Sequence, residues 1–355
     1  MKIRIFVGTG GVGKTSVTAA SALRSALDGD RCLLLTIDPA LRLRTALGLT
    51  STSADQKVPL ESVSSRGELW AALLDVRATM DRMVRRLGEP RKVEALLHHP
   101  VYQFLIASLA GMNELVAIER IDQAMTDGFE TLFIDTAPSR HAFEFLDKPE
   151  FFVQLINFPM VKLVGRTYKW WQKSASALLG RKSLDLYAGV EGILGASLVR
   201  QILDFFSTFQ TVAEGYAHRA KRTISLLRDP QTTSFTIVTT PLKSKRDTGY
   251  LWNELTKRKF FVEELVVNRL WPNRQVKLSP TASPPLRDLV SWYSSVCVSQ
   301  HQMWDKVFET WSGKIPRLIG LPELPRDVDG VAALVEMAKE MERAAVTKKP
   351  PTAPV

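Results

Sequence analysis

Short apolar segments rich in β-branched residues alternate with longer amphipathic segments along most of the chain. Such a pattern is typical of buried strands separated by crossover helices. It predicts an α/β fold with a mostly parallel, doubly wound sheet. The candidate strands are Ile3–Val7, Cys32–Ile37, Leu132–Ile134, Phe235–Thr239, Leu265–Val267 and Leu318–Ile319.

Most of these strands end at a polar or turn residue. In open α/β sheets, ligands bind beyond the carboxyl ends of the strands. The sequence therefore predicts one site assembled from distant segments. The residues at these ends are Gly8, Asp38, Asp135, Thr240 and Asn268.

Two helical stretches interrupt the alternation, and together they predict an inserted helical subdomain at one edge of the sheet. We expect a single domain over residues 1–345 and a basic, proline-rich tail over 346–355 that is disordered because it has nothing to bury. The predicted core covers about 1–76, 125–149 and 228–345, and the helical subdomain covers about 77–124 and 150–227.

The segment that follows the first strand fits the phosphate-loop pattern G-x-x-x-x-G-K-[ST] and opens a helix from Lys14 to about Leu27. Glycines let the backbone amides turn toward a polyphosphate, and the helix N-terminus adds positive charge. Lys14 would reach the β- and γ-phosphates, and the Thr15 hydroxyl would ligate Mg²⁺. ATP and Mg²⁺ are the predicted cofactors, and the predicted nucleotide-binding residues here are Gly8, Thr9, Gly10, Gly11, Val12, Gly13, Lys14, Thr15 and Ser16.

Two aspartates at strand ends complete the predicted chemistry, because a phosphate loop needs nearby carboxylates to hold the metal and orient the attacking water. Asp135 fits a metal-holding carboxylate that acts through a bound water, and Asp38 fits a residue that positions or deprotonates the water near the γ-phosphate. Either aspartate alone is only a polar strand end. Together with the phosphate loop, they favour an ATP-hydrolysing site with Thr15, Asp38 and Asp135 around the metal.

Composition and charge say more about the cellular location and possible partners of the protein than about its chemistry. The 355-residue chain has a net charge of +10, which fits either a surface that binds polyanions or ordinary solvated helix faces. Its two cysteines provide neither a disulfide framework nor a metal-ligand cluster, as expected in a reducing cytoplasm. The N-terminus is typical of a strand and not of a signal peptide, and no apolar run is long enough to span a bilayer. We expect a cytoplasmic protein whose membrane contact, if any, is peripheral.

These segments resemble the ArsA family, which includes arsenite-pump ATPases and the Get-pathway ATPases that target tail-anchored membrane proteins. The resemblance implies an ATPase that works as a nucleotide-sandwich homodimer. It also implies that Asp38 lies in a first switch loop, that Asp135 to about His141 form a second, and that Asn268 and the backbone near Pro322 contact adenine. The matching segments are GTGGVGKTS (8–16), TIDPA (36–40), IDTAPSRHAFEFL (134–146), VVNRLWP (266–272) and IGLPELP (319–325).

The chain also departs from the family pattern. Members of the deviant phosphate-loop class usually carry a lysine where this chain has Thr9, and that lysine reaches the partner's phosphates. We hypothesise that Arg140 or Arg42, in the switch loops, supplies transition-state charge instead; both arginines also fit ordinary ion pairs with carboxylates at the sheet edge. Cys297 has no second cysteine at C-x-x-C spacing, and two cysteines are too few for an arsenite site, so we expect neither zinc nor arsenite to bind.

The predicted helical insertion has more apolar side chains than one narrow stripe needs, notably near residues 151–163 and 198–209. These side chains either line a groove for a hydrophobic helix or fill the core of the insertion itself. The basic, tryptophan-containing segment 166–182 fits a membrane-interface contact or a solvated face. A hydrophobic client protein or an integral membrane protein is therefore the predicted partner.

Three functions remain open at this point. The first, which we favour, is an ATPase whose nucleotide state switches a client-binding helical subdomain. The second is the energising subunit of an anion or arsenite transporter. The third is a positioning ATPase of the MinD/ParA type, although we do not expect nucleic acid as a partner. GTP specificity is disfavoured because Asn268 is followed by Arg-Leu and not by the guanine-binding N-K-x-D pattern, and an iron-protein role lacks the cysteines for a cluster.

Overall fold

The computed structural model describes residues 1–37, 43, 47, 55–60, 65–108, 112–137, 196–272, 278–279 and 281–346. The chain divides into two compact units. The first comprises Met1–Leu74, Ala124–Phe143 and Ser225–Val355, and the second comprises Asp75–Gln123 and Glu144–Ile224. The division predicted from the sequence, with one domain that contains a helical insertion, stays a prediction.

The first unit is built on an eight-stranded sheet in the order β3-β4-β2-β5-β1-β6-β7-β8. Every neighbouring pair is parallel except β3 and β4, which are antiparallel. All six predicted strands are present, so the predicted mostly parallel α/β fold is confirmed. The strands are β1 (Lys2–Gly8), β2 (Arg31–Thr36), β3 (Gln56–Lys57), β4 (Glu68–Leu73), β5 (Thr131–Asp135), β6 (Thr233–Thr239), β7 (Val262–Leu270) and β8 (Arg317–Pro322).

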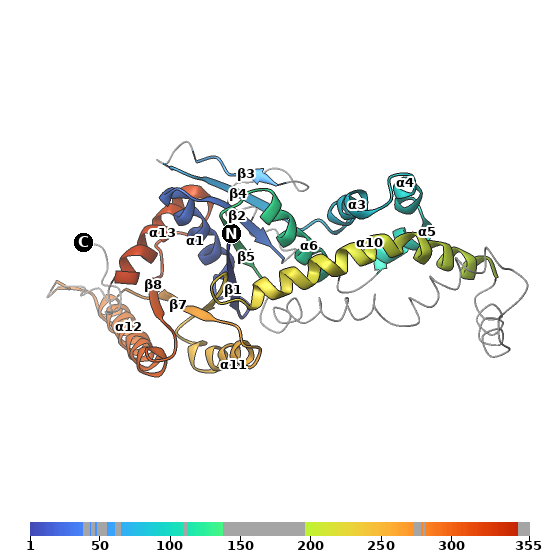
Figure 1. The fold of residues 1–355 in the computed structure, drawn as a ribbon. Helices are drawn as coiled ribbons and strands as arrows, with labels where there is room; N and C mark the ends of the chain where they lie inside the picture. The colour runs from blue at the N-terminus through green and yellow to red at the C-terminus, as the bar shows by residue number, and fades with distance from the viewer. Residues whose placement is uncertain are drawn as a thin grey trace, which may run out of the picture. The chain divides into compact units, whose positions relative to one another are not determined.

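Helices cover both faces of this sheet, as a doubly wound fold requires (Figure 1). Helices α1 (Lys14–Asp28) and α13 (Gly330–Val346) pack together on one face, and α11 (Ser244–Lys257) and α12 (Pro284–Trp311) pack on the other. The buried side of α1 carries several alanines, which let the helix lie close to the strands. This close packing fixes the start of α1, and with it the phosphate loop, against the end of β1.

Strands β3 and β4 were not predicted from the sequence. The β4 segment, Glu-Leu-Trp-Ala-Ala-Leu, is rich in residues that favour helices. It nevertheless pairs in parallel with all six residues of β2, and Leu69 and Ala71 are buried in the core. Tertiary pairing and burial therefore override the local helical preference.

The second unit is helical among its described residues. An ion-pair cluster ties three of its helices together: Arg86 pairs with Glu119, and Asp122 pairs with Arg219 at 2.8 Å and with Arg86 at 3.5 Å. Burial raises the pKa of the Glu119 carboxyl, although Arg86 partly opposes this shift. The helices are α3 (Val76–Leu87), α4 (Val93–Leu97), α5 (Pro100–Ser108), α6 (Met112–Thr126) and α10 (Ala196–Arg228).

Only part of the two helical stretches predicted from the sequence lies among the described residues of this unit. The expected helices between Arg77 and Ala124 are present. Of the second predicted stretch, only the part from Ala196 onward lies in the described residues, and it forms the long helix α10. The apolar segment 151–163 and the basic segment 166–182 lie outside the described residues.

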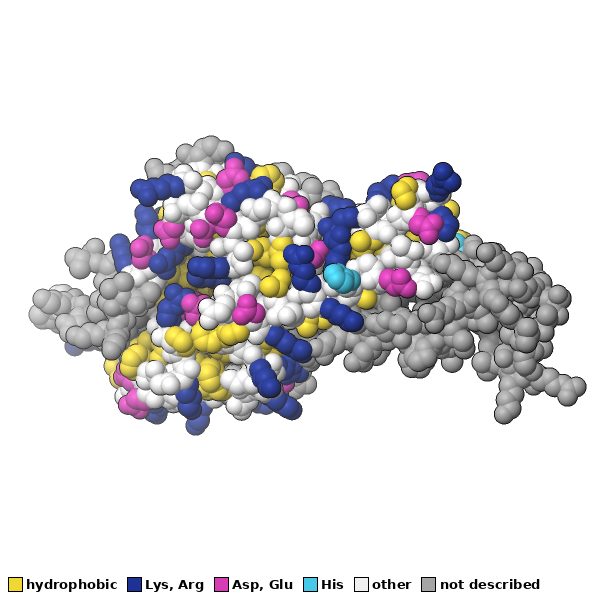
Figure 2. Space-filling view, in the orientation of Figure 1, with side chains coloured by type: hydrophobic (Ala, Val, Ile, Leu, Met, Phe, Trp, Pro, Cys, Tyr) yellow, Lys and Arg dark blue, Asp and Glu magenta, His cyan; other side chains and the backbone are white. Residues whose placement is uncertain are grey.

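No described helix combines the length and the apolar character needed to cross a bilayer. On the face shown in Figure 2, lysine and arginine side chains are spread widely, with acidic side chains among them. On that face, the positive charge is therefore dispersed.

Candidate nucleotide-binding site

The phosphate loop connects the central strand β1 to helix α1. Gly11 and Gly13 have φ values of +79° and +82°, a conformation that side-chain-bearing residues rarely adopt. Val12 between them is fully buried and anchors the loop in the core. A Cβ atom at Gly8 would lie 2.6 Å from the Val238 carbonyl oxygen on β6. The glycine pattern therefore follows from backbone geometry and from close contact with the neighbouring strand.

The outer part of the loop leaves space for a ligand. Gly10 and Gly11 are exposed, and a Cβ atom added to either would meet no atom of the described residues within 4 Å. Helix α1 begins directly beyond the loop, so its first backbone N–H groups add partial positive charge there. Lys14, in the first turn, is 7% exposed. The open glycine segment beside a helix N-terminus and a buried lysine fits a polyphosphate group.

Asp135 lies at the end of β5, next to the first turn of α1. The Thr15 hydroxyl donates a hydrogen bond of 2.8 Å to Asp135 Oδ2, and the Thr36 hydroxyl approaches the same oxygen at 3.4 Å. Asp135 is only 1% exposed. The Thr136 hydroxyl also donates to the Phe6 carbonyl oxygen at 2.7 Å, which ties the residue after β5 to β1. The sequence prediction that Thr15 and Asp135 lie together is therefore supported by a direct contact.

The oxygen atoms of Thr15 and Asp135 fit a magnesium ion in kind and number. Mg²⁺ prefers oxygen ligands, keeps several waters and commonly takes only one or two protein groups in addition to substrate phosphates. A hydroxyl and a carboxylate within hydrogen-bonding distance, beside the open glycine segment, satisfy that requirement. Thr15 would hold the ion directly, and Asp135 would hold it through a bound water.

Asn268, on β7, supports the phosphate loop from the other side. Its Nδ2 donates a hydrogen bond of 3.0 Å to the Val12 carbonyl oxygen, and its side chain is 5% exposed. A Cβ atom on Gly13 would lie 2.3 Å from this Nδ2. Gly13 is therefore required both by its positive φ and by the closeness of the asparagine amide.

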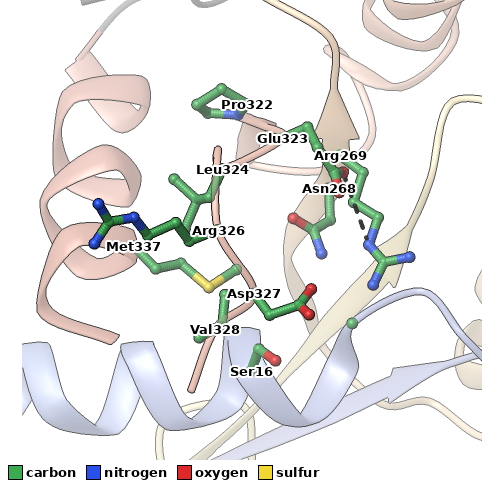
Figure 3. Close-up of a pocket in the computed structure, with 11 residues that line it drawn as sticks. Ser16, Asn268, Arg269, Pro322, Glu323, Leu324, Arg326, Asp327, Val328 and Met337 are labelled. Atoms are coloured by element: carbon green, nitrogen blue, oxygen red, sulfur yellow. Dashed lines mark ion pairs between the residues drawn. The ribbon is translucent and has the colours of Figure 1, made fainter. Parts of the chain in front are cut away.

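A small cavity of about 70 Å³ lies beside Asn268, between the ends of β7 and β8 and helices α1 and α13 (Figure 3). Figure 3 shows the Asn268 side-chain oxygen facing this cavity, as expected because the nitrogen is bonded to Val12. Arg269 and Glu323 form an ion pair of 3.9 Å at one side. The lining residues are Gly13, Ser16, Asn268, Arg269, Pro322, Glu323, Leu324, Arg326, Asp327, Val328 and Met337.

The structure thus brings most of the predicted segments to one edge of the sheet. Because β1, β5, β6 and β7 are parallel, Gly8, Asp135, Thr240 and Asn268 all lie at the carboxyl ends of their strands. Ser16 and Pro322 line the cavity, as their predicted roles in nucleotide binding require.

Several predicted residues cannot be placed, and one has a different local role. Asp38, Arg140 and Arg42 lie outside the described residues, so their proposed roles stay predictions. Thr240 contributes its carbonyl oxygen, which accepts the backbone N–H groups of residues 243 and 244 at the start of α11. The Thr9 hydroxyl oxygen is buried and has no hydrogen-bond partner among the described residues.

Sequence reasoning missed two groups of residues at this site. The cavity residues Arg326, Asp327 and Val328 come directly after the recognised segment IGLPELP (319–325), and this position was a usable signal. Lys243 was also missed, although its Nζ donates a hydrogen bond of 2.6 Å to the Gly10 carbonyl oxygen. Its only signal was a lysine shortly after the strand end at Thr239.

Both cysteines are buried free thiols. Burial in β2 raises the pKa of Cys32 to about 12. Because metals bind the thiolate, this shift makes Cys32 a poor ligand. The Cys297 sulfur lies 3.7 Å from the Pro272 carbonyl oxygen. Cys32 occupies the core strand in which the sequence placed it.

The fold and the loop define the class first: the mostly parallel sheet, with a phosphate loop between its central strand and α1, is that of a P-loop nucleoside triphosphatase. The comparison with known families is more specific, because residues 1–343 match the ArsA family, described as anion-transporting ATPases. The chain belongs to this ATPase family.

Individual relatives are similar over different portions of the chain. An ATPase ASNA1 homolog of Paramecium tetraurelia is 26% identical over 286 residues, which cover 77% of each chain. The ATPase get3 of Schizosaccharomyces japonicus is 23% identical over 344 residues, 94% of this chain and 90% of that protein. The arsenical pump-driving ATPase of Escherichia coli is 29% identical over 151 residues, 41% of this chain and 25% of that protein.

Replacing Thr15 with valine tests the metal site, because it removes the hydroxyl and keeps the side-chain shape. We expect Mg²⁺ to lose most of its effect on ATP binding, so that the affinity with Mg²⁺ falls about tenfold. The measurement is calorimetric titration with ATP, with and without Mg²⁺. Thr18→Val is the matched control, because the Thr18 hydroxyl bonds only to the Lys14 carbonyl oxygen within the same helix. An unchanged Mg²⁺ effect in Thr15→Val would contradict the assignment.

Replacing Asn268 with alanine tests base recognition at the cavity. The Asn268 oxygen can accept a hydrogen bond from the 6-amino group of adenine, whereas guanine presents an acceptor there. We expect Asn268→Ala to reduce the preference for ADP over GDP by about fivefold or more. Competitive titration with the two nucleotides measures this ratio. Asn253→Ala, at an exposed position on α11, is the control, and an unchanged ratio in Asn268→Ala would mean that the base is recognised elsewhere.

Proposed function

We propose that this ATPase binds and hydrolyses MgATP at the phosphate loop, and that its nucleotide state controls a helical unit that holds a hydrophobic client protein. The observation that carries the proposal is the contact of Thr15 with Asp135 beside the open glycine segment. This contact supports a site in which Thr15 and Asp135 bind a metal ion next to an open segment of the loop that can accommodate a triphosphate. The cavity at Asn268 supports adenine as the base.

In this proposal, each residue has a separate task. The amides of the glycine segment and Lys14 bind the phosphates, and Thr15 and Asp135 hold Mg²⁺, which would neutralise charge on the phosphate oxygens. Asp38 orients the attacking water and accepts its proton. Arg140 or Arg42 supplies positive charge to the transition state. The protein thereby provides position and charge, the main contributions to phosphoryl transfer.

We further propose that the ATPase acts as a homodimer with the phosphate loops facing each other. Beside the exposed Gly10 and Gly11, the β6–α11 loop presents Leu242, whose side chain is 80% exposed. An apolar side chain at that exposure is consistent with a surface that a second copy covers. The family resemblance supports the same arrangement.

A hydrophobic segment of a membrane protein is the proposed client of the helical unit. Phe104, on α5, is 66% exposed, which is unusual for a large apolar side chain and supports an apolar binding surface. We propose that the protein does this work in the cytoplasm, with peripheral contact to the membrane. The arginine-carboxylate cluster around Glu119 would keep α3, α6 and α10 together as the unit changes position.

A second candidate function is the energising subunit of an anion transporter. The description of the family as anion-transporting ATPases favours it, as does the name of the Escherichia coli relative. An arsenite version is less well supported, because the Cys32 thiol is buried and its pKa is raised. The client experiment below separates this candidate from the first.

The phosphate-binding role of Lys14 is tested by Lys14→Ala. We expect binding of MgATP and MgADP to weaken at least about a hundredfold, and hydrolysis to stop, because a desolvated ammonium next to the phosphates is lost. Calorimetry and phosphate release measure the two effects, and the thermal unfolding midpoint checks folding. Lys2→Ala, at the opposite end of β1, is the matched control. Equal affinities in parent and Lys14→Ala proteins would refute the site.

The client role is tested with Asp38→Asn, which we expect to stall in the ATP-bound state. With ATP, this variant should retain a purified membrane protein that has one C-terminal transmembrane helix, and should not retain the same protein without that helix. Asp28→Asn, an exposed position at the end of α1, and ADP in place of ATP are the controls. Equal retention with and without the helix would contradict the proposal, and selective retention of an integral transporter would favour the second candidate.

A further inference from the structure

The loop after β6 runs alongside the phosphate loop. Strands β1 and β6 are parallel neighbours, with Gly8 opposite Val238, so the segments that follow them leave the sheet at the same edge. The phosphate loop follows β1, and residues 240–243 follow β6 and lead into α11. Side chains from this second loop are therefore held beside the open glycine segment.

Lys243 is the residue of this loop that reaches the phosphate loop. Its Nζ donates a hydrogen bond of 2.6 Å to the Gly10 carbonyl oxygen. The Lys243 backbone is fixed, because its N–H donates to the Thr240 carbonyl oxygen at 3.0 Å and the next residue, Ser244, bonds through its hydroxyl to the Pro241 carbonyl oxygen at 2.8 Å. The side chain itself is exposed. A fixed backbone with an exposed ammonium group suits a residue that contacts a ligand from the rim.

The contact with Gly10 leaves the ammonium group available for a stronger acceptor. An ammonium group has three N–H donors, and this bond uses one of them. In the described part of the chain, no atom would lie within 4 Å of a Cβ atom on Gly10 or Gly11, so a ligand on the loop would lie close to the Lys243 ammonium group. A charged phosphate oxygen is a stronger acceptor than a neutral carbonyl oxygen.

We propose that Lys243 is a second phosphate-binding lysine of this ATPase. It contacts an oxygen of the bound polyphosphate from the rim of the site, while Lys14 contacts the polyphosphate from the base. This proposal rests on the proposed function, because it requires a polyphosphate on the loop. It assigns to the β6–α11 loop a role in nucleotide binding that the phosphate-loop pattern itself does not contain.

The test is Lys243→Met, which removes the charge and keeps most of the stem. We expect the affinity for inorganic tripolyphosphate with Mg²⁺ to fall about fivefold, the size of an exposed charge contact. The affinity should also depend less on salt concentration than in the parent, because one charge contact is lost. Calorimetric titrations at two salt concentrations measure both quantities.

Two further variants separate phosphate binding from a structural tie between the loops. Lys243→Arg keeps the charge and should stay within about twofold of the parent. Lys245→Met removes an exposed lysine two residues further along and should also stay within about twofold. If Lys243→Arg weakens binding as much as Lys243→Met does, or if the salt dependence does not change, Lys243 only ties the loops together and the proposal is wrong.

The outcome for Lys14→Ala distinguishes the failure of this proposal from that of the proposed function. If tripolyphosphate binds the parent and Lys14→Ala abolishes that binding, an unchanged Lys243→Met protein overturns only the role of Lys243. If neither the parent nor any variant binds tripolyphosphate or MgATP, the proposed function fails and the role of Lys243 fails with it.

Discussion

The site depends on one constraint, the position of β1 between β5 and β6 in a parallel sheet. Because neighbouring parallel strands end at the same edge, the phosphate loop after β1 emerges between the end of β5 and the loop after β6. One neighbour places Asp135 next to Thr15, and the other places Lys243 next to Gly10. The two strands that flank β1 therefore bring an acidic group and a basic group to opposite sides of the same loop.

The second support of the loop comes from β7, which is not adjacent to β1. Asn268 reaches past β6 to bond the Val12 carbonyl oxygen, and this bond turns the side-chain oxygen toward the cavity. The same side chain thus connects the cavity to the phosphate loop. Since Gly13 has no room for a Cβ atom beside the amide, the glycine and the asparagine depend on each other.

Most of the fold was predictable from the sequence, because buried parallel strands leave a strong pattern of β-branched residues. Among the described strands, the exceptions are β3 and β4; the β4 segment has the composition of a helix and forms a strand by pairing with β2. The loop and Asp135 were predictable because they follow recognisable strands. Lys243 and the cavity residues Arg326, Asp327 and Val328 were not predicted, since their importance comes from which strands are neighbours, and sequence spacing does not give strand order.

The two lysines beside the glycine loop differ in burial, and this difference suggests different tasks. Lys14 is 7% exposed, so under the proposed function its contact with a phosphate would be little screened by water. Lys243 is exposed and keeps its hydration, so its contact with a phosphate contributes less to affinity and is screened by salt. Under the proposed function, the buried Lys14 would determine whether a polyphosphate binds at all, and the rim residue Lys243 would mainly attract it.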